Sequence, residues 1–327
     1  MLRRRILLVA CSGLAACRGL RLGAVAASHA GLTRRFGAAA TAEKSAEGLE
    51  EIYAAIAASL PQQEANYAAW LGSGAVDAAS LEAAAARCGL RLDVARGTLS
   101  YGSDFAPPDL GFELWYCRHG KTTGNTEPRV YQGYVDEPSN ALNDVGLGQA
   151  EDAAHKLEAL GLDPDLVVLS PLSRAAETGR AFLRRRPDLT ETLWDSTAEM
   201  RFGDWDNVMV KDMPRDSICH LFYLSQNAVV KASAPYVDPA TGREIPGENF
   251  VEVCDRMRAV LDDLSAAVAA LPPPKNGARH VALLYGHSMA GAALSILTGN
   301  GKQVDGETYL GFDGKYIMPN ATPVRLL

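Results

Sequence analysis

One short stretch of the sequence combines a cation, an imidazole and flexible backbone, which are groups that can hold and transfer a phosphate. Arg118 and His119 follow an apolar, aromatic run that starts at Phe112, and Gly120 and Gly124 then break the chain into a polar loop. A guanidinium binds phosphate oxygens through a rigid fork of donors, and a neutral imidazole nitrogen can attack phosphorus. The stretch predicts a phosphate site. The alternative, for this pair alone, is an incidental Arg-His sequence in a strand-end loop.

Two later segments also end in a basic side chain after a short apolar run. Residues 165–170 lead to Arg174, and residues 280–286 are followed directly by His287. Continuous apolar runs of this length are typical of strands buried on both faces of a parallel sheet. Ligands bind at the carboxyl ends of such strands. We therefore expect Arg174 and His287 to join the Arg118–His119 pair in one cationic pocket.

Three segments carry a resemblance to a known family. Residues 118–125 resemble the R-H-G-x-T-x-x-N signature of the histidine phosphatase superfamily, also called the phosphoglycerate mutase-like family. Residues 170–178 match its S-P-L-x-R-A-x-x-T motif at every fixed position, and residues 199–207 resemble its E-x-x-F-G-x-W-E-G segment with a changed end. The resemblance covers roughly residues 111–327. It implies an α/β fold of three layers, α/β/α, around a mostly parallel central sheet.

The resemblance also implies roles for individual residues. His119 would be the nucleophile, and Arg118, Arg174 and His287 would bind the transferring phosphoryl group. The other residues expected to bind phosphate or substrate are Thr122, Asn125, Gln132, Gly133 and Ser288. The chain departs from the family pattern near two of these, because three extra residues follow Pro138 and Ser288 replaces a glycine.

A carboxyl group is expected to protonate the leaving oxygen. Glu199 occupies the acid position of the family. Asp204 and Asp206 are nearby alternatives, and either would otherwise be an ordinary loop acid.

The implied activity is metal-independent hydrolysis of a phosphomonoester through a phosphohistidine on His119, with no metal and no cofactor. Fixed cations would stabilise the charge that a metal stabilises in other phosphoryl-transfer enzymes. A cofactor-dependent phosphoglycerate mutase is the second hypothesis, although residues 199–207 and 247–250 favour the phosphatase branch. The third hypothesis is a non-catalytic module that binds a phosphorylated partner, and the presence of both His119 and Glu199 argues against it.

Composition narrows the class of partner. The chain has 327 residues and a net charge of −7, which argues against nucleic-acid binding as the main function. A small phosphorylated substrate is the expected partner, and the oligomeric state stays open.

The six cysteines are scattered without metal-like spacing. A hydrophobic content of 47% with 22% charged residues allows an ordinary soluble core.

The N-terminal region divides into two parts. Residues 1–42 contain no Asp or Glu and carry seven arginines among small and apolar residues, which is typical of an organelle transit peptide. We expect a mitochondrial address, with a plastid address as the alternative; a signal peptide over residues 6–16 is a rival interpretation. The sequence of residues 43–108 predicts a helical extension of two or three helices that packs on the catalytic domain, residues 109–327. An independent functional module is the alternative.

One segment inside the catalytic domain is hard to interpret. The sequence of residues 208–245 predicts a helical insertion over the catalytic edge of the sheet. At that position the insertion would influence substrate specificity. The basic residues that could bind a second acidic group, or be ordinary surface charge, are Lys211, Arg215, His220, Lys231 and Arg243.

Overall fold

The computed structural model describes residues 48–274, 279–304, 307–308 and 318–327. The predicted targeting segment, residues 1–42, lies outside the described residues. Among the helices of the described ranges, none combines the length and apolar character needed to cross a membrane.

A five-stranded sheet with the strand order β11-β3-β8-β4-β5 forms the centre of the protein. Its strands are β3 (Glu113–Arg118), β4 (Leu166–Leu169), β5 (Thr192–Leu193), β8 (Val281–Gly286) and β11 (Val324–Arg325). The first four run parallel, and β11 pairs antiparallel with β3 at one edge. The three apolar runs are thus confirmed as strands, whereas the two-residue strand β5 carried no recognisable signal.

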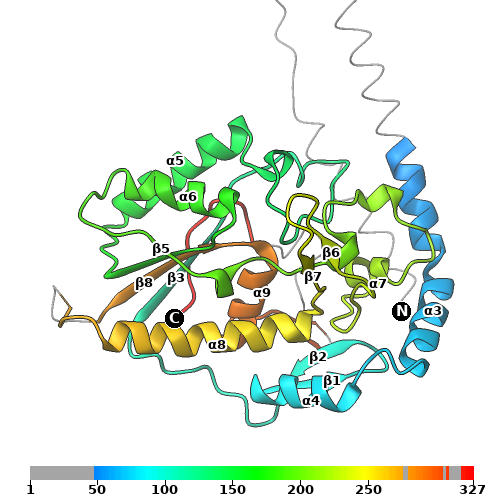
Figure 1. The fold of residues 1–327 in the computed structure, drawn as a ribbon. Helices are drawn as coiled ribbons and strands as arrows, with labels where there is room; N and C mark the ends of the chain where they lie inside the picture. The colour runs from blue at the N-terminus through cyan, green and yellow to red at the C-terminus, as the bar shows by residue number, and fades with distance from the viewer. Residues whose placement is uncertain (1–47, 275–278, 305–306, 309–317) are drawn as a thin grey trace, which may run out of the picture.

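Two pairs of helices cover the sheet (Figure 1). Helices α5 (Asp144–Ala159) and α6 (Ser173–Leu183) pack on one face, and α8 (Phe250–Ala269) and α9 (Ser288–Leu297) pack on the other. Alternate strand residues supply the two cores: Ala282 and Leu284 face one cluster, whereas Leu283 and Tyr285 face the other. Burial on both faces explains the continuous apolar runs, and the three-layer prediction is confirmed.

The helix starts are set by side-chain caps in two cases. The Asn143 side chain accepts the Gly146 N–H before α5, and Asn249 forms a capping box with Glu252 before α8. Helix α6 has Leu172 as its N-cap with no side-chain hydrogen bond, although Ser170 lies two residues earlier. The Ser170 hydroxyl is used elsewhere in the site.

The N-terminal extension is not wholly helical. It contains a helix over residues 48–58, then α3 (Leu60–Gly72) and α4 (Ala78–Arg87), followed by an antiparallel hairpin of β1 (Leu90–Asp93) and β2 (Thr98–Tyr101). The hairpin was missed because its short strands, LRLD and TLSY, mix polar and apolar residues and form no continuous apolar run. Gly97, with φ of +66°, closes the turn between them in a conformation that favours glycine.

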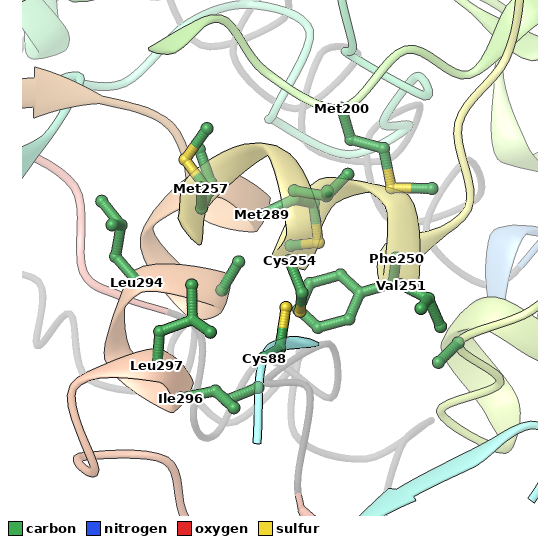
Figure 2. Close-up of a cluster of buried hydrophobic side chains, with 14 of the residues drawn as sticks. Cys88, Met200, Phe250, Val251, Cys254, Met257, Met289, Leu294, Ile296 and Leu297 are labelled. Carbon is green, nitrogen blue, oxygen red and sulfur yellow. The ribbon is translucent and has the colours of Figure 1, made fainter. Parts of the chain in front are cut away.

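The extension shares the core of the catalytic domain (Figure 2). Cys88, which follows α4, is buried beside Cys254 and Phe250 of α8 and Leu297 of α9. At the surface, Arg87 binds Asp255 of α8 with an Nη2–Oδ2 distance of 2.7 Å. The extension is therefore packed on the domain.

The insertion over residues 208–245 is less helical than expected. It contains one 3-10 turn, η5 (Val210–Asp212), the six-residue helix α7 (Cys219–Leu224), and a small antiparallel pair of β6 (Tyr236–Val237) and β7 (Glu244–Ile245). Helix α7 contacts α3 of the extension. The remaining short elements are η2 (Pro138–Asn140), η3 (Asp195–Thr197), η4 (Gly203–Trp205), β9 (Gln303–Val304) and β10 (Glu307–Thr308).

Candidate active site

The four basic side chains predicted to gather at one sheet edge do so. Arg118 ends β3 and His119 follows it, His287 follows β8, and Arg174 lies in the first turn of α6. Arg118 pairs in register with Gly286, so the two histidines leave neighbouring parallel strands together. Their ring centroids are 5.3 Å apart. All four side chains are buried, Arg174 and His287 completely.

The surroundings of His119 keep one of its ring nitrogens unprotonated, as a nucleophile would require. Its Nδ1 lies 2.7 Å from the Gly120 carbonyl oxygen. A carbonyl can only accept a hydrogen bond, so Nδ1 carries the proton and Nε2 keeps its lone pair. Burial, together with the charges of Arg174 and Arg118, holds the pKa of His119 well below its usual value. The imidazole is therefore neutral near pH 7.

The two arginines keep donors available for a phosphate. Arg118 Nη1 donates to the Met318 carbonyl at 2.8 Å, and Arg174 Nη2 donates to the Gly133 carbonyl at 2.6 Å. Arg118 Nε and both Nε and Nη1 of Arg174 are buried without a hydrogen-bond partner among the described residues. Burial lowers the pKa of Arg118 to about 10. Buried, charged donors of this kind suit a doubly charged oxyanion.

His287 is held by two residues whose roles sequence reasoning missed. The Tyr116 hydroxyl accepts the His287 N–H at 2.6 Å and donates to the His287 carbonyl at 2.7 Å. Ser170 Oγ lies 2.7 Å from His287 Nε2. Nδ1 of His287 is buried with no partner in the described part of the chain. If Ser170 donates to Nε2, Nδ1 is the protonated nitrogen and can donate to a phosphoryl oxygen.

We expect Ser170→Ala to lower kcat about tenfold, because one hydrogen bond that selects the His287 tautomer is lost. Ser170→Thr, which keeps the hydroxyl, should recover most of the rate. Steady-state kinetics on an aryl phosphate would measure both. Ser173→Ala is the matched control, since its exposed hydroxyl bonds Asp136. Equal losses in the alanine and threonine variants would contradict this role.

Glu199 lies at the N-terminus of α9, in the wall of the same cavity as Arg118 and His119. Its Oε1 accepts the Ala290 N–H at 3.1 Å, and its Oε2 lies 3.2 Å from Ser288 Oγ. A hydroxyl can donate to a carboxylate or accept from a carboxylic acid. Ser288 can therefore partner Glu199 in both protonation states.

The alternative acids occupy other environments. Asp204 is exposed. Asp206 is buried, and its two oxygens accept the backbone N–H groups of Tyr134 and Phe202 at 3.1 and 3.0 Å. Burial raises the pKa of Asp206 to about 7. Asp206 therefore ties two loops together and does not line the cavity.

The remaining predicted contacts divide into two groups. Asn125, Gln132 and Ser288 line the cavity, whose volume is about 210 Å³. Thr122 and Gly133 do not line the cavity but hold residues of the site in place. The Thr122 hydroxyl donates to Gln132 Oε1 at 2.9 Å, and the Gly133 carbonyl orients Arg174. A Cβ at Gly133 would collide with Asp206 Oδ1, so the close approach requires glycine.

The motif that carries Arg174 also orders the His119 loop. Thr178, its last fixed residue, donates to the Arg174 carbonyl at 2.7 Å and accepts the Gly120 N–H at 3.1 Å. Asn320 donates to the His119 carbonyl at 2.8 Å and lines the cavity. These bonds connect three elements that are far apart in the sequence.

The cations in the cavity wall are not those suggested in the insertion. Lys121 and Arg129 line the cavity, together with Tyr223 of α7. Lys121 belongs to the first motif, residues 118–125, whereas Arg129 lies outside every motif and was not predicted from the sequence. None of the five basic candidates lines this cavity: they are Lys211, Arg215, His220, Lys231 and Arg243. Within the described ranges, no group of three or more His, Cys, Asp or Glu side chains could hold a metal ion.

Comparisons with known proteins identify the family of this chain. A sequence profile of the histidine phosphatase superfamily (branch 1) matches residues 114–271. The chain is 42% identical over 304 residues to mannitol-1-phosphatase of Eimeria tenella, covering 88% of this chain and 98% of the relative.

Solved structures of phosphatases are also similar. A mycobacterial glucosyl-3-phosphoglycerate phosphatase is 24% identical and covers 65% of this chain and 89% of its own, with a TM-score of 0.48. The alpha-ribazole phosphatase of Shigella flexneri is 21% identical with the same two coverages, 65% and 89%, and a TM-score of 0.45.

The 42% identity to a phosphatase over nearly its whole length favours hydrolysis over the mutase and binding-module hypotheses. The chain therefore belongs to the histidine phosphatase superfamily, and it is a phosphatase.

Proposed function

We propose that this phosphatase hydrolyses the phosphomonoester of a small polyol or sugar, with mannitol 1-phosphate as the first candidate substrate. The observation that carries this proposal is the 42% identity to a mannitol-1-phosphatase across 98% of that relative's length. The form of the cavity supports it independently.

The cavity suits a small, hydroxyl-rich alcohol. Its volume of about 210 Å³ is below the roughly 300–1,000 Å³ of pockets that bury drug-sized ligands. Side chains that can hydrogen-bond hydroxyl groups line it, among them Asn125, Gln132, Ser288 and Asn320.

The first chemical step transfers the phosphoryl group to the protein. Nε2 of His119 attacks phosphorus, the N–P bond forms and the P–O bond to the alcohol breaks. Glu199, in its acid form, donates a proton to the leaving oxygen, so the product leaves as a neutral alcohol. Arg118, Arg174 and His287 stabilise the charge on the other phosphoryl oxygens.

The second step regenerates the site. The Glu199 carboxylate takes a proton from water, and the water oxygen attacks phosphorus as the N–P bond breaks. Inorganic phosphate leaves, His119 is again neutral and Glu199 is again protonated. The N–H donors that hold Glu199 at the start of α9 keep it at the same position in both steps.

A substrate panel tests the proposal. Phosphate release by the full chain in EDTA would be compared for mannitol 1-phosphate, glucose 6-phosphate, 3-phosphoglycerate, AMP and a phosphoserine peptide. We expect kcat/KM for mannitol 1-phosphate to exceed that for AMP and 3-phosphoglycerate by at least about tenfold. Preference for AMP or the phosphopeptide would contradict the proposal.

A further inference from the structure

One guanidinium in the cavity wall has no part in the phosphate site described above. Arg129 lies in the loop after the first motif, and its carbonyl accepts the Val210 N–H at 3.0 Å. The adjacent Val130 forms a bridge with Met209. Arg129 therefore belongs to the part of the wall built with the insertion, as does Tyr223. Arg118 and His119, in contrast, lie at the end of a central strand, so Arg129 is placed to meet the alcohol portion of a substrate.

Glu127 orients Arg129. Arg129 Nε donates to Glu127 Oε1 at 2.7 Å, and the Arg129 backbone N–H donates to Oε2 at 3.3 Å. This arrangement uses one of the five guanidinium N–H donors for the carboxylate and leaves terminal N–H groups for other acceptors. It also neutralises the charge of Arg129, which favours uncharged hydroxyl groups over a second anion.

A residue of the N-terminal helix completes this arrangement. The Tyr53 hydroxyl, in the helix over residues 48–58, donates to Glu127 Oε2 at 2.7 Å. That helix leads into α3, which packs beside α7 at the edge of the molecule (Figure 1). The carboxylate of Glu127 therefore connects the N-terminal extension to Arg129 in the cavity wall.

We propose that Arg129 binds the alcohol portion of the substrate, and that Tyr53 of the N-terminal helix positions Arg129 through Glu127. Arg129 is then a specificity-determining residue, and Tyr53 and Glu127 are positioning residues. The inference rests on the proposed function for the class of alcohol, a small molecule rich in hydroxyl groups.

The ion pair between Arg129 and Glu127 contributes little to folding. The side chains of Arg129 and Glu127 are 42% and 43% exposed. An exposed ion pair contributes little to stability, in the range of about 0–1 kcal/mol. Variants at these positions should therefore fold, and changes in their kinetics can be assigned to the substrate.

The first experiment compares mannitol 1-phosphate with p-nitrophenyl phosphate, whose leaving group has no alcohol hydroxyls. Arg129→Gln should raise KM for mannitol 1-phosphate about tenfold, because charge-assisted hydrogen bonds are lost. Its kinetics on p-nitrophenyl phosphate should stay close to wild type. Arg91→Gln, at an exposed position of β1, is the matched control. An equal effect of Arg129→Gln on both substrates, or none on either, would overturn the inference.

The second experiment tests the positioning residues. Tyr53→Phe should raise KM for mannitol 1-phosphate about threefold, with kcat and the p-nitrophenyl phosphate kinetics retained, because one hydrogen bond is lost. Glu127→Gln removes the neutralising charge, so the ratio of kcat/KM for 3-phosphoglycerate to that for mannitol 1-phosphate should increase. An unchanged ratio in Glu127→Gln and an unchanged KM in Tyr53→Phe would exclude the positioning role.

Failure of the proposed function would be recognised separately. If the wild-type panel shows that another small phosphate is preferred, the substrate assignment is wrong. The Arg129→Gln comparison is then made between that preferred substrate and p-nitrophenyl phosphate. A selective loss would still support Arg129 as the specificity residue, and a parallel loss would refute it.

Discussion

Alanine in place of His119 should abolish turnover, with kcat lowered by at least about 10⁴-fold on every substrate. Nε2 of His119 is the only group proposed to form a bond to phosphorus, so the phosphoenzyme cannot form without it. The measurement is phosphate release from p-nitrophenyl phosphate and from the best natural substrate. Inorganic phosphate should still bind, because Arg118, Arg174 and His287 remain.

His155→Ala is the matched control for this variant. His155 lies on the surface of α5, where its Nδ1 is 3.7 Å from Glu158, and it should be dispensable. Wild-type protein quenched in alkali should carry an alkali-stable, acid-labile phosphoryl group that the His119 variant lacks. Turnover in His119→Ala within tenfold of wild type would show that another residue is the nucleophile.

Glutamine in place of Arg174 should lower kcat about 10³-fold, comparable to the loss of an arginine that stabilises phosphoryl transfer elsewhere. Arg174 is completely buried, and two of its guanidinium nitrogens have no partner among the described residues. These donors are therefore available to the equatorial oxygens of the transition state. Binding of inorganic phosphate as a competitive inhibitor should weaken in parallel.

The same variant should not lose stability. Burial lowers the pKa of Arg174, although the carboxylates of Glu199, Asp136 and Asp206 act in the opposite direction. Arg118 lies close enough for the two charges to repel. Removing one buried cation therefore relieves a cost of folding. We expect the free energy of unfolding, measured in urea, to stay unchanged or increase.

Arg180→Gln, on the same helix, is the contrasting control. Arg180 binds Glu191 at the surface with an Nη2–Oε1 distance of 2.7 Å and should matter little for catalysis. If Arg174→Gln unfolded at a clearly lower urea concentration with kcat reduced only in proportion to folded protein, Arg174 would be structural and not part of the phosphate site.

Short patterns in the sequence predicted the central part of the fold. Each of the runs that became β3, β4 and β8 is apolar over four to six residues, because both of its faces are buried. The hairpin of β1 and β2 and the strand β5 were not predicted. Their pairing partners, and not their own residues, decide that they are strands.

The site, like the fold, has one part that could be predicted from the sequence and one part that could not. His119, Arg174 and His287 could be found because each directly follows a strand or opens the next helix within a recognisable motif. The position of Ser170 just before a helix favours a helix cap, because serine often has that role. In the structure its hydroxyl instead meets a histidine 117 residues away.

By itself, then, the sequence predicted the site residues and the three-layer fold, because short segments of it resemble family motifs. The candidates found in this way include the proposed nucleophile His119 and the proposed acid Glu199. Only the tertiary structure decided which groups orient them. Tyr116 clamps His287 from the neighbouring strand, and Tyr53 reaches Glu127 across 74 residues of chain. Such contacts arise from the packing of whole elements against one another, and no window of sequence contains both partners.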